Sequence, residues 1–124
     1  MSNSKDLSRP DSMNIPAMGE WAASVHKEAE KANTREAWVL AAQAHVAHAE
    51  SSVELCYTLI LHEPRKDIHR EAKRAFWQAR RSAKKAAIND SRFSDHILLV
   101  GAKEHAKDAR EFARVAQERA FEHS

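Results

Sequence analysis

Apolar residues recur at steps of three and four along most of the chain, the spacing that places them on one face of a helix. The first such stretch covers about residues 16–32, and its stripe comprises Met18, Ala22, Val25, Ala29 and Ala32. Pro16 suits a first turn, where its missing N–H would be unpaired anyway. Asn33 and Thr34 predict a break, with Thr34 capping the next helix. A single kinked helix is the alternative.

The second stretch, about residues 35–61, is apolar on two faces. A helix of this kind is expected to lie centrally and to touch at least two neighbours. Pro64 ends it, because the residue before a proline is disfavoured in the helical region. The heptad-like seam is Val39, Ala42, Val46, Ala49, Val53, Cys56 and Ile60, and the second face is Trp38, Ala41, Leu55 and Leu59.

Two further helices are predicted after Pro64. The third covers about residues 65–88, and the short connection makes it an antiparallel neighbour of the second. Residues 89–91 form a turn, after which Ser91 or Ser94 caps a fourth helix that continues to about Phe121. The buried stripes are Ile68, Ala72, Ala75, Ala79, Ala83 and Ala86 in the third helix and Leu98, Ala102, Ala106, Ala109, Ala113, Ala116 and Ala120 in the fourth.

Together these patterns predict an all-α fold, an elongated antiparallel bundle of about four helices with alanine-rich close packing. Residues 14–124 form its single domain. Residues 1–13 are predicted to be a disordered tail, because they are polar, mixed in charge and contain Pro10.

Alanine supplies 23 of the 53 hydrophobic residues, so only 30 larger apolar side chains remain for a core. Such a thin core leaves room for a partner or a second copy of the chain to cover an apolar face. No run approaches the 18 apolar residues of a membrane span, so no membrane partner is predicted. The N-terminus also lacks the apolar region of a secretory signal, which makes the cytoplasm the default location.

Positive charge is concentrated in the third predicted helix. Residues 65–89 contain nine bases and two acids, a net charge of +7, whereas the whole chain carries +2. Trp77 lies about 200° around the helix from Ala75, opposite the alanine stripe. Its neighbours on that side are Lys73, Arg80, Arg81 and Lys84.

Cations neutralise phosphates and an aromatic ring can stack on a base, so this face suits a nucleic acid. We predict a non-enzymatic helical module that binds nucleic acid or a nucleoprotein. The predicted contact residues are Arg70, Lys73, Arg74, Trp77, Arg80, Arg81, Lys84 and Lys85.

Two alternatives use the same residues. In the first, the chain is a small adaptor, inhibitor or immunity-type protein that docks on an acidic protein through this face. In the second, the face is merely solvated. Trp77 then packs on the first helix, and acids of the second and fourth helices neutralise part of the row of bases.

The eight histidines raise the question of a metal site. His45 and His48 are one turn apart, as are His105 and Asp108, and such pairs can hold a divalent metal across a bundle. The chain has no Glu-x-x-His or His-Glu-x-x-His motif, however. No metal or cofactor is therefore predicted, and His45 and His48 are interpreted as partly buried, hydrogen-bonded side chains. The remaining five are expected near helix ends or on exposed faces: His26, His62, His69, His96 and His123.

Nucleophilic chemistry is not predicted either. Cys56 is the only cysteine and falls on the apolar seam, which is typical of a small buried hydrophobe. Gly19 and Gly101 stand alone, so no glycine-rich phosphate loop exists.

Overall fold

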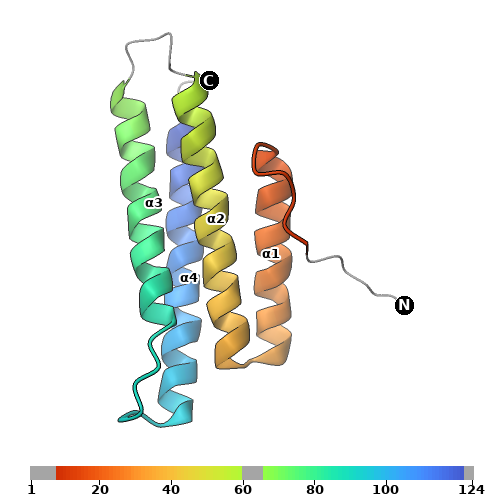
Figure 1. The fold of residues 1–124 in the computed structure, drawn as a ribbon, viewed down its shortest axis with the longest axis vertical. Coiled ribbons are helices and arrows are strands. Elements are labelled where there is room, and N and C mark those ends of the chain that lie inside the picture. The colour runs from red at the N-terminus through yellow and green to blue at the C-terminus, as the bar shows by residue number, and fades with distance from the viewer. Residues whose placement is uncertain (1–7, 60–65, 122–124) are drawn as a thin grey trace, which may run out of the picture.

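The computed structural model describes residues 8–59 and 66–121, and within these ranges it contains four helices and no strand. Successive helices run in opposite directions (Figure 1). The predicted all-α bundle is confirmed. The helices are α1 (Ile15–Ala32), α2 (Arg35–Leu59), α3 (Lys66–Ala86) and α4 (Asp95–Ala120).

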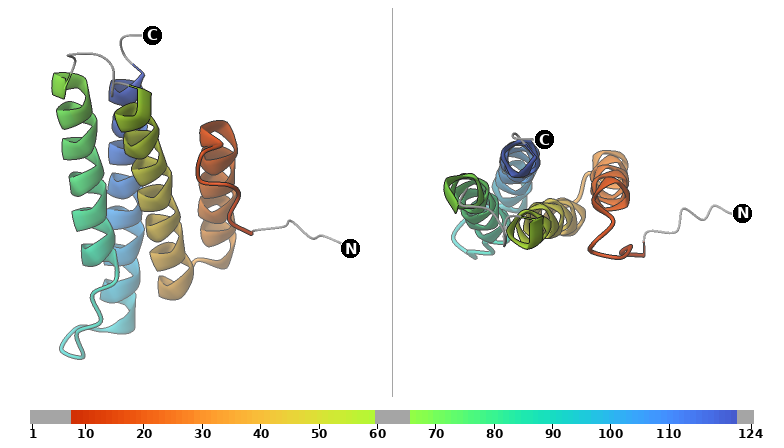
Figure 2. Two further views of the ribbon diagram at one scale, coloured as in Figure 1. Left: turned by 45° about the horizontal axis from the view of Figure 1, so that its top comes forward. Right: turned by 90° about the horizontal axis from the view of Figure 1, so that it is seen from above.

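The helix α2 occupies the centre of the molecule. It packs against α1, α3 and α4, as its two apolar faces predicted. The helices α3 and α4 also pack against each other, so α2, α3 and α4 form a three-helix group. The backbone of α1 packs against α2 alone among the described elements, on the side away from α3 (Figure 2).

The first two helices are separate, as the Asn33–Thr34 pair predicted. Asn33 adopts the left-handed conformation, with φ of 49°, and its N–H donates to the carbonyl of Ala29 at 2.7 Å. The Thr34 hydroxyl accepts from the N–H of Ala37 at 3.2 Å and so caps α2. A single kinked helix is therefore wrong, because both ends of the break carry their own caps.

The predicted tail falls partly outside the described residues, which begin at Ser8. Its last residues form a turn. The N–H of Met13 donates to the Asp11 carboxylate at 2.9 Å, and the N–H of Asn14 donates to the Asp11 carbonyl at 3.0 Å. The Asn14 side chain then caps α1.

The turn between α3 and α4 is tied to the start of α2. Arg35 donates from Nη2 to the Ala87 carbonyl at 2.7 Å and from Nε to the Ile88 carbonyl at 3.4 Å. These carbonyls follow the end of α3, where no intrahelical donor remains. Ser94, one of the two predicted caps, accepts from the N–H of Ile97 at 3.2 Å and starts α4.

The core is built largely from alanine methyl groups, and the predicted stripes of α3 and α4 are buried except at Leu98, which is half-buried. One cluster lies between α2, α3 and α4 and includes Val53, Cys56, Ile68 and Phe76. A second cluster surrounds Trp38 and brings in Ala29 of α1. The predicted seam position Ile60 lies outside the described residues, and nothing is described of the Leu59 side chain. No described helix combines the length and the hydropathy that a bilayer span requires.

The buried stripe of α1 differs from the predicted one. Val25 is half-buried and Ala32 is exposed, whereas His26 is only 3% exposed. The stripe therefore passes through Ala22, His26 and Ala29, and the prediction that His26 lies near a helix end or on an exposed face is wrong. A stripe defined by apolar residues alone does not include the polar imidazole of His26.

Candidate nucleic-acid interface

The helix α3 buries its alanine side against α2 and α4 and turns its other side to solvent. All eight predicted contact residues are exposed. At 100° per residue they fill an arc of about 140° centred close to Trp77. We call this surface the basic face: Arg70, Lys73, Arg74, Trp77, Arg80, Arg81, Lys84 and Lys85.

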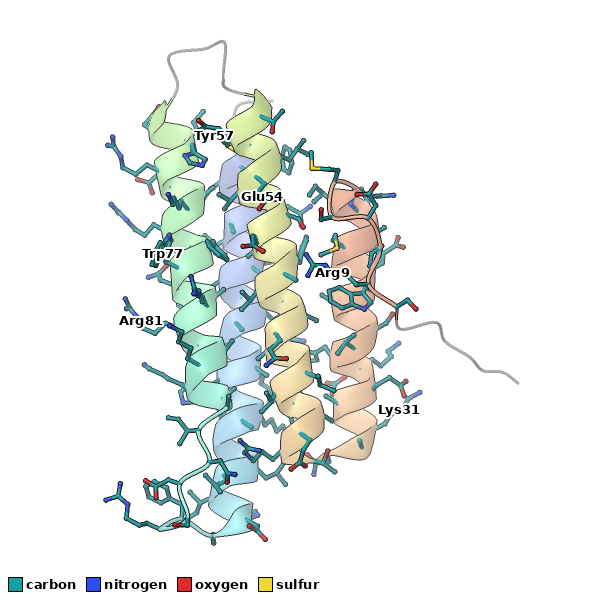
Figure 3. All side chains as sticks on the ribbon, viewed as in Figure 1. Arg9, Lys31, Glu54, Tyr57, Trp77 and Arg81 are labelled. Atoms are coloured by element: carbon teal, nitrogen blue, oxygen red, sulfur yellow. The ribbon has the colours of Figure 1, made fainter. Side chains whose placement is uncertain are left out.

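Trp77 lies at the middle of the basic face and is 52% exposed. Figure 3 shows it with Arg81 on the outer side of α3, away from α2. Its ring meets the buried ring of Phe76 edge-on, with centroids 6.4 Å apart. Packing of Trp77 on the first helix is wrong, because α1 makes no packing contact with α3.

Arg80 lies over the indole of Trp77. Its guanidinium carbon is 5.8 Å from the ring centroid, within the range of a cation–π contact. Phe76 and Arg80 thus hold the ring from two directions while half of it stays open to solvent.

The cations of the basic face have no acidic partner among the described residues. None of the ion pairs in that part of the chain involves a base of α3. On α4, by contrast, Arg114 pairs with Glu111 and with Glu118. Direct neutralisation of the bases by acids of α2 and α4 is therefore not found in residues 8–59 and 66–121.

Two shallow grooves border the basic face. The groove between α2 and α3 has a volume of about 260 Å³ and is lined by Gln43, Val46, Arg80, Ala83, Lys84 and Ala87. The groove between α3 and α4 has a volume of about 340 Å³ and is lined by Gln78, Arg81, Ser82, Lys85, His105, Asp108 and Phe112. Cations therefore stand on both sides of Trp77.

The histidines considered for a metal do not converge. His105 is 3.6 Å from Asp108 and lies in the groove between α3 and α4, whereas His45 and His48 are buried elsewhere. Within the described ranges, no group of three or more His, Cys, Asp or Glu side chains is arranged to hold a metal ion.

His45 instead faces His26 of α1. The Nδ1 atom of His26 is 2.9 Å from Nε2 of His45, and Nη1 of Arg110 on α4 is 3.1 Å from Nε2 of His26. Burial and the neighbouring cations lower the pKa of both imidazoles, that of His45 to about 3. The pattern of apolar residues does not predict this cluster, although His26 lies four residues after Ala22 and three before Ala29, on one helical stripe.

Cys56 is fully buried, and burial raises the pKa of its thiol. The thiolate, which is the reactive form, is therefore disfavoured at neutral pH. The prediction of a small buried hydrophobe is confirmed for this residue.

The chain matches no protein-family model, no curated protein and no solved structure.

Proposed function

We propose that the protein is a non-enzymatic helical module that binds nucleic acid, or a nucleoprotein, through the basic face of α3. The observation that carries the proposal is the row of exposed cations around Trp77 that have no acidic partner in the described chain. A phosphate chain would supply the missing negative charges, and binding would release its counterions.

The dimensions of the basic face suit a polymer better than a single anion. Arg70 and Lys85 are 15 residues apart, or about 22 Å along the helix. Cations occupy both ends of this length, and Trp77 lies in the gap between Arg74 and Arg80. Contact would be made mainly to phosphates, because no element presents a known pattern for reading bases.

An electrophoretic mobility shift series with DNA and RNA at rising salt tests the proposal. We expect binding at low salt that weakens steeply as salt rises. The double variant Arg80→Glu with Lys84→Glu should abolish or strongly weaken it. The matched control is Lys27→Glu with Lys31→Glu, which has the same spacing and the same change in charge. Both control residues are exposed on α1. Figure 3 shows Lys31 on the opposite side of the molecule from α3.

Absence of binding to DNA and RNA at low salt would overturn the proposal, as would equal binding by the two double variants. Capture from a lysate, with and without nuclease, then separates the alternative. An acidic protein that stays bound after nuclease treatment, and is lost in the Arg80→Glu, Lys84→Glu variant, would favour a protein-binding adaptor.

A further inference from the structure

The surroundings of Trp77 bear on the form of nucleic acid that the basic face would accept. In a duplex the bases stack on one another and present only their edges in the grooves. In a single strand the flat faces of the bases are open and stack readily on aromatic side chains. A half-exposed indole offers a flat surface on which the face of a base can stack. The edge of a base in a duplex groove cannot stack on it.

The indole is held in place before any ligand arrives. Phe76 meets it from the core side, and Arg80 lies over it at 5.8 Å from the ring centroid. A ring whose orientation is already restricted loses less conformational entropy when a base stacks on it. Arg80 also has a planar guanidinium, which can share the contact with a base or reach a phosphate.

The cations surround Trp77 in the way that a stacked nucleotide requires. A nucleotide within a strand has one phosphate before its sugar and one after it. Lys73 lies one turn before Trp77 on α3, and Arg80, Arg81 and Lys84 lie one to two turns after it. Phosphates on either side of a base at Trp77 would therefore each meet a cation.

We infer that the basic face binds single-stranded nucleic acid with at least one base stacked on the indole of Trp77. The inference rests on the proposed function, because it presumes that a nucleic acid occupies this face. It adds that base stacking, and not phosphate contact alone, contributes to binding.

The test compares three forms of one oligomer: single-stranded oligodeoxythymidine, the same strand annealed to its complement, and a strand of equal length in which every base is absent. The abasic strand keeps all the phosphates. We expect tightest binding to the intact single strand. Trp77→Ala should weaken that binding by about 5- to 150-fold, the effect of losing one base–aromatic stack. The same variant should bind the abasic strand as the unchanged protein does.

The salt dependence separates stacking from charge. Trp77→Ala removes no cation, so the slope of log K against log salt should stay unchanged. Trp77→Phe keeps a smaller ring and should retain much of the affinity. Phe93→Ala serves as the control, because Phe93 is similarly exposed, at 47%, and lies outside the basic face in the turn before α4. It should bind all three oligomers unchanged.

Tryptophan fluorescence gives a second readout. Trp38 is buried and Trp21 is half-buried, so Trp77 is the most exposed of the three indoles. Stacking of a base should quench its emission when the intact strand binds. The quenching should be much smaller with the abasic strand and should be lost in Trp77→Phe.

The results distinguish this inference from the proposed function. Equal or tighter binding of the duplex, with no effect of Trp77→Ala, would overturn the inference and leave the proposed function standing. An equal loss on intact and abasic strands would also overturn it, because the tryptophan would then act without a base. Absence of binding to all three oligomers and to RNA would overturn both.

Discussion

The Nδ1 atom of His26 on α1 lies 2.9 Å from the Nε2 atom of His45 on α2, and this contact sets the protonation of both rings. Arg110 approaches the other nitrogen of His26 at 3.1 Å, and a guanidinium can only donate. Nε2 of His26 therefore accepts, which places the proton of that ring on Nδ1. His26 then donates to His45, and both imidazoles are neutral.

This arrangement makes the fold sensitive to acid. Protonation of His45 at Nε2 would place two N–H groups against each other. Protonation of His26 at Nε2 would place an N–H group against the guanidinium of Arg110. Burial, followed by the charge of Arg110, lowers the pKa of His26, although Glu30 acts in the opposite direction. Burial is also the main cause of the lowered pKa of His45, and burial lowers the pKa of His48 as well.

Stability should therefore fall as the pH drops below about 6.5, where histidines of the unfolded chain take up protons and these buried ones do not. Their contribution to stability is fully present above that pH, because the pKa of each buried histidine is lower in the folded chain than in the unfolded chain. Each histidine that stays neutral should cost about 1.4 kcal/mol per pH unit. Urea unfolding at several pH values between about 7.5 and about 4.5 measures the slope. A slope no different in His45→Leu would contradict the assignment.

Arg110→Gln should make the protein less sensitive to acid. The variant keeps a donor near Nε2 of His26 but removes the positive charge that helps to lower the pKa of His26 and of His45. Both pKa values should rise toward that of an ordinary histidine. The folded chain would then protonate more readily and lose less stability in acid. Histidine proton resonances followed by NMR during a pH titration give the two values. Unchanged titration curves would show that Arg110 has no electrostatic effect on the pair.

The two glycines should respond differently to alanine. Both lie inside helices, where glycine costs about 1 kcal/mol relative to alanine. A Cβ at Gly101 meets nothing within 4 Å, so Gly101→Ala should stabilise the protein by about 0.5–1 kcal/mol. A Cβ at Gly19 would lie 3.3 Å from two atoms of the buried His48 ring. Gly19→Ala should therefore stabilise the protein much less than Gly101→Ala does, or should destabilise it. Chemical unfolding of the two variants side by side decides this, and equal gains would contradict the close packing of α1 on α2.

Neutral substitutions should show which side of the basic face follows the phosphates. Each cation that contacts a single strand contributes about 0.7 to the slope of log K against log salt. Arg80→Gln with Lys84→Gln, on the side toward α2, should lower the slope by about 1.4 if both bind phosphate. Arg81→Gln with Lys85→Gln makes the same test on the side toward α4. Fluorescence anisotropy across a salt series measures both. The pair Lys27→Gln with Lys31→Gln should leave the slope unaltered, and a similar fall in that control would mean that net charge alone governs binding.

The basic face could be predicted because it follows from the geometry of one helix. The spacing of the alanines in α3 places them on one face, which packs against other helices. Residues on the opposite face therefore point to solvent, whichever helices cover the alanines. The break at Asn33 could also be predicted locally, because its neighbour Thr34 is a residue that caps helices. Local spacing and local capping decide these features without reference to the rest of the chain.

The position of α1 and the His26 cluster were decided only by the tertiary structure. A stripe such as Ala22 and Ala29 shows that a face is buried but not which helix covers it. Whether His26 meets His45 depends on how α1 is rotated against α2, and whether Arg110 reaches the pair depends on the neighbouring α4. For the same reason, the exposure of Trp77 could be established only from the tertiary structure, in which α1 packs on α2 and leaves the outer side of α3 uncovered. The sequence alone therefore determined the helices and the side of α3 that carries the charge, while packing between helices decided what covers each face.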